Sequence, residues 1–268
     1  MKRWFLGLCV SLFVVLTVSA ARTDTVRVYS ETMKKDVKVV VVTPARGVLQ
    51  AFPVIYLLHG YSGNAASWAQ LTDLNRLAEL YQVIFACPDG LNSWYWDSPR
   101  DPSSQYETFV SRELIAYVDS HFPTVPDRSA RAISGLSMGG HGALWSAIRH
   151  RDVFGAAGSM SGGVDIRPFP DNWEMKKQLG ERDANREVWD AHTVINQVDG
   201  LKDGDLALIV DCGADDFFFG VNNALHQALL NRKIAHDYIV RPGGHTGAYW
   251  ANSIEYHVLF FRKYFNRR

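Results

Sequence analysis

Apolar residues recur along this chain in short runs, and these runs alternate with longer segments whose apolar residues follow a helical period. Short apolar or alternating runs are typical of strands, and longer periodic segments are typical of amphipathic helices. The predicted strands span residues 25–30, 37–42, 53–58, 83–87, 131–134, 153–160, 206–210 and 237–240. The predicted helices span residues 71–81, 106–122, 143–148, 221–231 and 249–264. This alternation predicts an α/β protein with a mostly parallel central sheet and helices on both faces.

One segment breaks the alternation. Residues 164–205 are highly charged, contain Trp173 and Trp189, and lack the periodicity of the flanking regions. We therefore expect irregular structure with one or two short helices, forming a partial cap inserted into a single domain that spans residues 22–268. Open α/β sheets bind ligands at the carboxyl ends of their strands, and the glycine-rich, polar and aromatic loops of this chain follow those ends.

The start of the chain has the pattern of a cleaved export signal. Lys2 and Arg3 form a basic start, residues 4–18 are almost wholly apolar, and Ala20 ends a small-residue cleavage sequence. The apolar run is too short to span a bilayer comfortably. We predict a signal peptide over residues 1–20 and a periplasmic or secreted mature protein that does not associate with the membrane. An uncleaved anchor is the alternative.

Two cysteines remain after the predicted cleavage, Cys87 and Cys212. Export would permit a disulfide between them. Each ends a predicted strand, and the expected strand order separates these strands by several positions at about 4.8 Å per position. Because that separation exceeds the reach of a disulfide, we predict two free, buried thiols.

Composition narrows the classes of partner. The chain has 28 Lys and Arg residues and 28 Asp and Glu residues, so bulk charge favours neither nucleic acid nor an anionic membrane. No cysteine and histidine spacing resembles a metal site, and we expect no cofactor. The sequence carries no signal for a particular oligomeric state.

The stretch AISGLSMGGHGAL, residues 132–144, contains the motif G-x-S-x-G centred on Ser137. In a nucleophile elbow the serine occupies a strained turn from strand to helix, and the turn leaves no room for a Cβ atom on the flanking glycines. The motif alone is common, and a plain glycine-rich turn is the alternative. Its position between an apolar run and a helix-forming run favours Ser137 as a nucleophile.

A serine hydroxyl needs an adjacent base. Among the nine histidines of the chain, His245 lies in the loop RPGGHTG after the last predicted strand, on the same edge of the sheet as Ser137. Seven of the others are predicted to lie in helices (His121, His141, His150, His226, His257), in the cap (His192) or at the opposite edge (His236). His245 is therefore the predicted base, and a chain order of Ser, Asp and His is that of α/β-hydrolases.

The imidazole in turn needs a buried carboxylate at its other nitrogen. Asp211, Asp215 and Asp216 follow the predicted strand 206–210. Asp211 is still at the strand end, where we expect its carboxylate to accept hydrogen bonds from loop amides. The side chains of Asp215 and Asp216 diverge, so only one of them can face His245, and the residue pattern does not choose between them.

An ester carbonyl under attack develops negative charge that two preset backbone amides must stabilise. The amide of Met138 follows the nucleophile directly. The second donor is expected from the loop after residue 58, where Tyr61 is the natural candidate.

Five segments resemble the esterase D family, which includes tributyrin-type esterases, feruloyl esterases, S-formylglutathione hydrolases and mycolyl transferases. They are YLLHGYSGN at 56–64, PDGLNSWY at 88–95, YETF at 106–109, GLSMGG at 135–140 and DDF at 215–217. The resemblance implies an α/β-hydrolase fold, places the acid at Asp216, and supports Ser137, His245 and the amides of Met138 and Tyr61. S-formylglutathione hydrolases of this family are cytosolic, whereas this chain begins with a predicted export signal.

Together these residues predict an exported serine carboxylesterase that hydrolyses short-chain or aromatic acyl esters, including acetyl or feruloyl esters of carbohydrate. Its partner would be a small-molecule or carbohydrate ester. Trp94, Trp96, Phe217 and Trp250 are the predicted substrate-binding residues, and the alternative is that they only pack the loops onto the sheet. The rival functions are acyl transfer to a sugar hydroxyl, hydrolysis of an S-formylglutathione-type thioester, a non-catalytic carbohydrate-binding role, and a serine peptidase.

Overall fold

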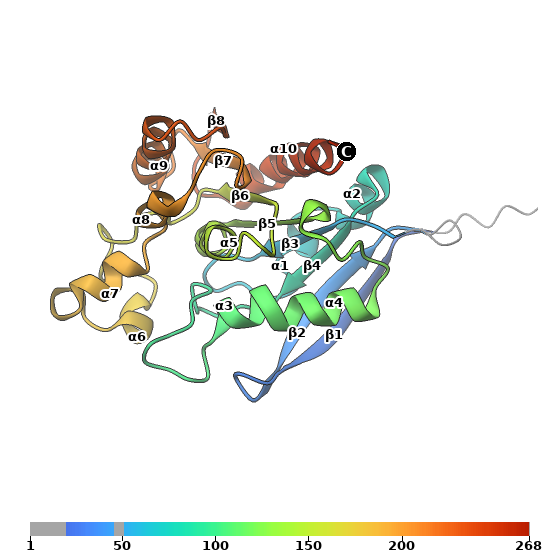
Figure 1. The fold of residues 1–268 in the computed structure, drawn as a ribbon, viewed down its shortest axis with the longest axis horizontal. Helices are drawn as coiled ribbons and strands as arrows, with labels where there is room; N and C mark the ends of the chain where they lie inside the picture. Colours follow the sequence, from blue (N-terminus) through green and yellow to red (C-terminus); the bar gives the residue numbers. More distant parts are fainter. Residues whose placement is uncertain (1–19, 46–50, 268) are drawn as a thin grey trace, which may run out of the picture.

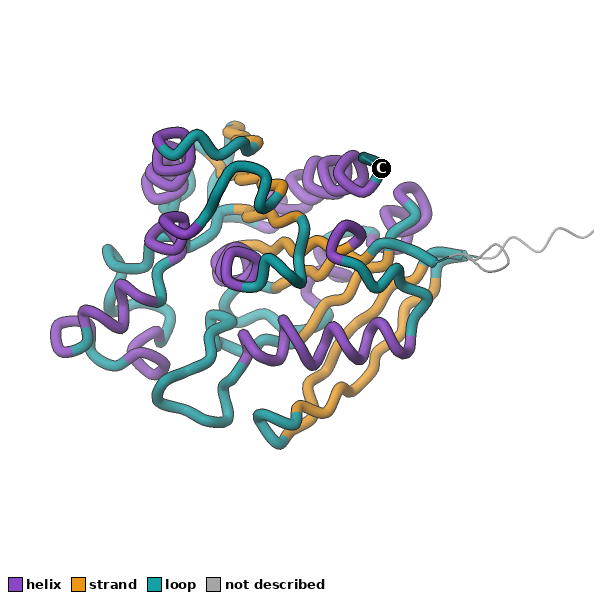
Figure 2. The backbone as a smooth tube through the Cα atoms, viewed as in Figure 1, coloured by secondary structure: helices purple, strands orange, loops and turns teal. Residues whose placement is uncertain are grey.

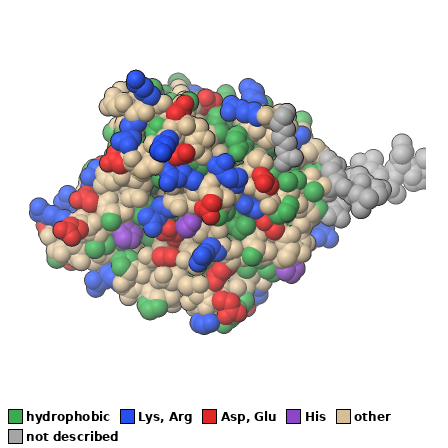
Figure 3. Space-filling view, in the orientation of Figure 1, with side chains coloured by type: hydrophobic (Ala, Val, Ile, Leu, Met, Phe, Trp, Pro, Cys, Tyr) green, Lys and Arg blue, Asp and Glu red, His purple; other side chains and the backbone are tan. Residues whose placement is uncertain are grey.

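The computed structural model describes residues 20–45 and 51–267. The predicted signal peptide lies outside the described residues, apart from Ala20. None of the described helices is both long and apolar enough to cross a lipid bilayer. Basic and acidic side chains are interspersed over the face drawn in Figure 3, in keeping with the balanced charge of the chain.

A single eight-stranded sheet forms the centre of the molecule, with the strand order β1-β2-β4-β3-β5-β6-β7-β8 (Figure 1). The strands are β1 Arg22–Ser30, β2 Lys35–Thr43, β3 Val54–Leu58, β4 Ile84–Pro88, β5 Arg131–Leu136, β6 Ala156–Met160, β7 Ala207–Gly213 and β8 Asp237–Arg241. β2 pairs antiparallel with β1 and with β4, and all other neighbours are parallel. The predicted mostly parallel sheet is confirmed, and the carboxyl ends of β3 to β8 share one edge.

Helices cover both faces of this sheet (Figures 1 and 2). One face carries α1 Ser67–Leu71, α2 Leu74–Tyr81 and α10 Gly247–Phe265, and the other carries α3 Tyr106–Thr108, α4 Leu114–His121, α5 Met138–Arg149 and α9 Phe219–Asn231. Side chains of β3 alternate between the two cores: Val54, Tyr56 and Leu58 pack on the α5 side, and Ile55 and Leu57 on the α10 side. Both faces of a parallel strand are buried, which explains its continuous apolar run.

Several predicted elements differ from the structure at their ends. The predicted helix at 71–81 begins at Leu74 as α2, because the Asp73 side chain accepts a hydrogen bond from the Arg76 amide and caps it, and Leu71 ends the separate helix α1. The predicted helix at 106–122 contains a π-helical turn at Phe109–Glu113. β6 begins at Ala156 rather than 153, because Val153 donates its amide to the His150 carbonyl in a turn.

The segment 164–205 contains more regular structure than we expected. It forms three short α-helices, α6 Met175–Leu179, α7 Arg186–Ala191 and α8 Val194–Gln197, and two 3₁₀ turns. α6 and α7 lie at the outer end of the molecule, away from the sheet (Figure 1). Trp189 anchors them from inside, where its buried indole nitrogen donates to the Gly180 carbonyl at 3.0 Å.

The two described cysteines behave as predicted. Cys87 in β4 and Cys212 in β7 are free and buried. β3, β5 and β6 lie between their strands, so the separation that we used to exclude a disulfide is present.

Candidate active site

Ser137 occupies the sharp turn between β5 and α5, with φ of 55° and ψ of −118°. Residues other than glycine rarely adopt such positive φ values, and the strain is typical of functional turns. A Cβ atom on Gly135 would lie 2.3 Å from the Gly139 carbonyl oxygen, and one on Gly139 would lie 2.2 Å from the Leu58 carbonyl oxygen. Both flanking positions therefore require glycine, as the elbow interpretation predicts.

His245 lies between Ser137 and Asp216. Its Nε2 atom is 2.9 Å from the Ser137 hydroxyl oxygen, and its Nδ1 atom is 3.0 and 2.9 Å from the two carboxylate oxygens of Asp216. A carboxylate only accepts hydrogen bonds, so the imidazole proton lies on Nδ1 and the Nε2 lone pair faces the hydroxyl. The hydroxyl, imidazole and carboxylate therefore form one hydrogen-bonded series.

The geometry separates the two adjacent aspartates. The Asp216 side chain is fully buried, and its Oδ1 atom also accepts the Phe218 amide at 2.8 Å. Asp215 is exposed, and its amide donates to the Gly243 carbonyl at 2.9 Å. That backbone bond ties the aspartate loop to the His245 loop and leaves Asp216 facing the imidazole.

Asp211 has a different role from the one we expected. Its buried carboxylate accepts the Tyr249 hydroxyl at 2.5 Å and the Arg241 guanidinium at 2.7 Å, rather than loop amides. Burial raises the pKa of Asp211, while these two bonds act in the opposite direction. The prediction failed because both donors come from residues that follow in the chain, in β8 and α10. Asp211 therefore fastens the two elements that flank the His245 loop.

The loop after β3 is rigidly held. The Nε2 atom of His59 accepts the Gly90 amide at 2.8 Å, so Nδ1 carries the proton and donates to the Gly60 carbonyl at 2.7 Å. The Tyr95 hydroxyl donates to the His59 carbonyl at 3.2 Å. We did not predict either residue, although both lie in segments that carry the family resemblance. Their contacts fix the backbone that bears the Tyr61 amide.

The amides of Tyr61 and Met138 are free to act as donors. Within the part of the chain that the structure describes, neither donates to another residue. Met138 is the first residue of α5, where helical geometry leaves amides without an internal partner and the helix dipole favours negative charge. Both amides are thus suited to an anionic oxygen.

A cavity of about 420 Å³ opens beside Ser137 and His245. Its lining includes Tyr61, Leu71, Leu136, Trp173, Phe217 and Trp250, and no Asp, Glu, Lys or Arg side chain among the described residues. Phe217 and Trp250 flank the His245 ring at centroid distances of 4.2 and 4.8 Å. The cavity is therefore a neutral, aromatic-walled site next to the nucleophile. The described residues also contain no cluster of three or more His, Cys, Asp or Glu side chains that could hold a metal ion.

Trp94 and Trp96 do not line this cavity, so our prediction that they bind substrate is wrong. Both are buried, stack on each other at 5.6 Å, and pack edge-on against His141. Both indoles therefore pack against His141, whose Nδ1 donates a hydrogen bond to the Gly163 carbonyl at 3.0 Å. Trp173, from the cap segment, lines the cavity instead. Nothing in the periodicity of 164–205 marks this residue.

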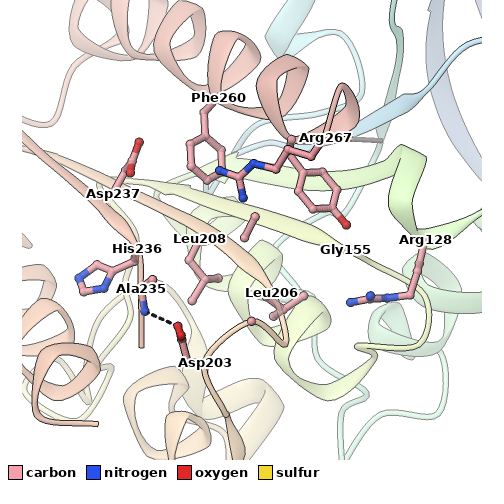
Figure 4. A pocket seen from close by; sticks show the side chains of 13 residues that line it. Arg128, Gly155, Asp203, Leu206, Leu208, Ala235, His236, Asp237, Phe260 and Arg267 are labelled. Atoms are coloured by element: carbon pink, nitrogen blue, oxygen red, sulfur yellow. Dashed lines mark hydrogen bonds between the residues drawn. The ribbon is translucent and has the colours of Figure 1, made fainter. Parts of the chain in front are cut away.

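A second cavity, of about 280 Å³, lies at the amino ends of β6, β7 and β8 (Figure 4). It contains no serine, threonine or cysteine among the residues that line it. The Arg128 guanidinium there bonds to the main-chain carbonyls of Arg151, Phe154 and Asp205, and Asp203 accepts the Ala235 amide. Arg128 and Asp203 are therefore engaged in holding loops together, and this cavity lies at the end of the strands opposite Ser137.

Residues 30–261 match the protein family described as "Putative esterase". An acetyl esterase from Caldicellulosiruptor saccharolyticus is 26% identical over 253 residues, covering 85% of this chain and 95% of that protein. The S-formylglutathione hydrolase of Bos taurus is 24% identical over 260 residues, covering 87% and 91%. The solved structure of a ferulic acid esterase is similar with a TM-score of 0.81 and 26% identity, covering 92% of this chain and all of that one. The neighbouring structures have the α/β-hydrolase fold.

Proposed function

Because the chain belongs to the esterase family that residues 30–261 match, and is a carboxylic ester hydrolase, we propose that Ser137, His245 and Asp216 hydrolyse the ester through an acyl-enzyme. The observation that carries this proposal is the hydrogen-bonded series from the Ser137 hydroxyl through His245 to the Asp216 carboxylate. It unites a nucleophile, a base and an orienting acid at the mouth of a cavity.

In the first half of the proposed reaction, the Ser137 oxygen attacks the ester carbonyl carbon while His245 Nε2 takes the hydroxyl proton. The carbonyl oxygen becomes an oxyanion that the amides of Tyr61 and Met138 stabilise. The intermediate collapses, the bond to the alcohol oxygen breaks, and His245 returns its proton to that oxygen. Asp216 holds the imidazole in the required tautomer and stabilises its charged form.

In the second half, water attacks the acyl-enzyme carbonyl and His245 takes a proton from the water. The second oxyanion occupies the same two amides. Its collapse releases the carboxylic acid product, and the proton on His245 returns to the Ser137 oxygen. One preset oxyanion donor typically contributes roughly 2.7–4 kcal/mol of transition-state stabilisation. The arrangement thus uses one base and one oxyanion site in both steps.

We propose that the substrates are neutral esters with short or aromatic acyl groups, including acetyl or feruloyl esters of carbohydrate. The uncharged, aromatic lining of the cavity supports this class, as do the names of the acetyl and ferulic acid esterases to which the chain is similar. A glutathione thioester carries carboxylates and an ammonium group, and the lining offers them no charged partner. A neutral ester is therefore favoured over S-formylglutathione.

The test is a panel of p-nitrophenyl acetate, butyrate and octanoate with methyl ferulate, measured on the wild type and on Ser137→Ala. We expect Ser137→Ala to abolish hydrolysis of every substrate and the wild type to prefer acetate or ferulate over octanoate. Product analysis with an added sugar acceptor separates hydrolysis from acyl transfer. If Ser137→Ala hydrolysed these esters at the wild-type rate, Ser137 could not be the nucleophile.

Export is also part of the proposal, supported by the basic start, apolar run and small-residue sequence at residues 1–20. We expect cell fractionation to find the protein in the periplasm or the medium, with a mature amino terminus at Ala21. Recovery of an unprocessed chain in the membrane fraction would support the uncleaved anchor instead.

A further inference from the structure

The aromatic wall beside His245 is completed by a residue from the cap segment, Trp173. We propose that Trp173 is a specificity-determining residue that packs against a planar aromatic ring of the ester substrate. This inference rests on the proposed function, because it concerns the same cavity. It assigns a role to the segment 164–205, which the proposed chemistry does not otherwise use.

The backbone at this position is strained. Trp173 and the residue after it, Glu174, both have positive φ, at 48° and 56°. Consecutive left-handed residues with side chains are unfavourable and persist only where the surroundings enforce them, most often at functional sites. Trp173 is half-buried and lines the cavity. The strained turn is therefore located where the cap meets the cavity.

Side chains from the main domain hold this turn in place. The Trp94 indole nitrogen donates to the Trp173 carbonyl at 3.3 Å. The side-chain Nδ2 of Asn92 donates to the Glu174 carboxylate at 3.3 Å, and its side-chain Oδ1 accepts the Ser62 main-chain amide at 2.9 Å. Ser62 follows Tyr61, the proposed oxyanion donor. The position of Trp173 is thus linked to the loop that bears the proposed oxyanion donor Tyr61.

The indole of Trp173 continues an aromatic series that ends at the imidazole. Its ring stacks on Phe217 at 5.7 Å with an interplanar angle of 20°. Phe217 in turn lies 4.2 Å from the His245 ring. Phe217 remains 52% exposed and lines one cavity together with Trp173 and Trp250, and contiguous exposed apolar surface marks binding sites. A substrate ring at the mouth would cover this apolar surface.

The chemistry of the lining defines the ligand class. Aromatic side chains favour planar rings through offset or edge-on contacts, and the absence of charged lining groups favours a neutral ring. The ring could belong to the acyl group, as in a ferulate, or to the alcohol, as in a phenyl ester. A ring on either side of the ester would make the same contact with Trp173, and esters that carry a ring on only one side distinguish the two cases.

The experiment compares Trp173→Leu with the wild type on methyl ferulate, phenyl acetate and triacetin. Leucine keeps apolar bulk without a ring, and Trp173→Phe restores a ring. We expect Trp173→Leu to lose roughly tenfold in kcat/KM, mainly through KM, on at least one ring-bearing ester. Triacetin should change less than about twofold, and Trp173→Phe should recover most of the loss.

The pattern of losses identifies the source of the ring. A loss on methyl ferulate alone assigns the contact to the acyl group, and a loss on phenyl acetate alone assigns it to the alcohol. Equal losses on all three esters, or none on either ring-bearing ester, would overturn the proposal.

A binding measurement separates this proposal from the proposed function. Calorimetry of methyl ferulate and phenyl acetate with Ser137→Ala, and with Ser137→Ala combined with Trp173→Leu, detects the ring contact without turnover. Weaker binding by the double variant supports the role of Trp173 even if the wild type hydrolysed no ester. Equal binding by the two variants, together with turnover that depends on Ser137, would reject Trp173 and leave the esterase function intact.

Discussion

The Nε2 atom of His245 lies 2.9 Å from the Oγ atom of Ser137, although 108 residues separate them in the chain. Ser137 follows β5, and His245 follows β8 at the far end of the sheet, with β6 and β7 between. The loop after β8 must therefore reach back across two strands. Its bonds to the aspartate loop, from the Ala214 amide to the Arg241 carbonyl and from the Asp215 amide to the Gly243 carbonyl, hold it there.

Asp216→Asn should reduce kcat by about ten-thousand-fold, because an amide can stabilise the wrong imidazole tautomer and carries no charge. The neighbouring substitution Asp215→Asn is a matched control, since Asp215 is exposed and the imidazole bonds to Asp216 instead. It should leave kcat close to the wild-type value. The measurement is steady-state hydrolysis of p-nitrophenyl acetate. A larger loss in Asp215→Asn would transfer the role of the acid to that residue.

The sequence was sufficient to predict that Ser137 and His245 lie together at one edge of the sheet, because their positions follow from the order of strands and loops. The residue pattern alone left Asp215 and Asp216 open, and only the family resemblance favoured Asp216. The physical reason is that the direction of these side chains depends on the bond from the Asp215 amide to Gly243, a residue in another loop. Short-range patterns do not encode such a contact.

The aromatic residues show the same limit. Trp94 and Trp96 follow a strand at the correct edge, yet their rings turn inward because the loop takes left-handed conformations at Leu91, Trp94 and Tyr95. Those conformations depend on partners elsewhere, such as the His59 carbonyl that accepts the Tyr95 hydroxyl. We did not predict Trp173 as a residue of the cavity, because its segment has no periodicity and reaches the cavity through long-range contacts.

Gly139→Ala should destabilise the protein by about 1–3 kcal/mol, the typical cost of overpacking a core. The new Cβ would lie 2.2 Å from the Leu58 carbonyl oxygen, which is backbone and cannot rotate away. Gly220→Ala is the matched control, because Gly220 lies in α9 and, apart from its chain neighbours and its own helix backbone, no atom lies within 4 Å of the added methyl group. It should be neutral or stabilising by up to about 1 kcal/mol. Urea unfolding measures both changes, and similar stabilities for the two variants would contradict the close approach at the elbow.

Stability should fall as the pH drops below about 6.5, the ordinary histidine pKa. Burial lowers the pKa of His141 and of His257 to about 3, with nearby His192 and Arg241 contributing in the same direction. Between these values the unfolded chain binds protons that the folded protein does not, so protonation favours unfolding. At pH 5 each histidine should remove about 2 kcal/mol of the stability present at pH 7.

Urea unfolding at pH 7, 6 and 5 measures this slope. His257→Gln removes one of the buried groups and should make the pH dependence shallower. His121→Gln is the control, because His121 is exposed on α4, and its slope should match the wild type. An unchanged slope in His257→Gln would show that the His257 ring is already protonated or accessible in the folded state.

The thiols of Cys87 and Cys212 should not react with Ellman's reagent in the folded protein. Both side chains are buried, and burial raises the pKa of each thiol, so little thiolate is present to act as a nucleophile. The experiment uses a Cys9→Ser variant so that only these two thiols are counted. Denaturation in guanidinium should then release both, and rapid reaction of either one before denaturation would contradict the buried positions.

Asp211→Asn should destabilise the protein by about 1–3 kcal/mol, because it removes an acceptor from the buried donors of Tyr249 and Arg241, while burial of the Asp211 charge already offsets part of its favourable pairing. The Asp211 side chain is fully buried and the Arg241 side chain is 18% exposed. Asparagine keeps the shape but loses the charge that faces Arg241. Glu31→Gln, in the exposed pair with Lys34, should leave the unfolding midpoint unchanged.

Comparing Asp211→Asn with Asp216→Asn then distinguishes an aspartate that stabilises the fold from one that orients the imidazole. The two residues lie on adjoining parts of one strand and loop. Asp211 lies beneath the His245 loop and bonds to Arg241 and Tyr249 on either side of it, whereas Asp216 bonds to the imidazole itself. Asp211→Asn should lower the unfolding midpoint while the folded fraction keeps measurable turnover. Asp216→Asn should lose turnover with a much smaller change in midpoint. An Asp211→Asn protein as stable as the wild type but inactive would mean that Asp211, and not Asp216, supports the base.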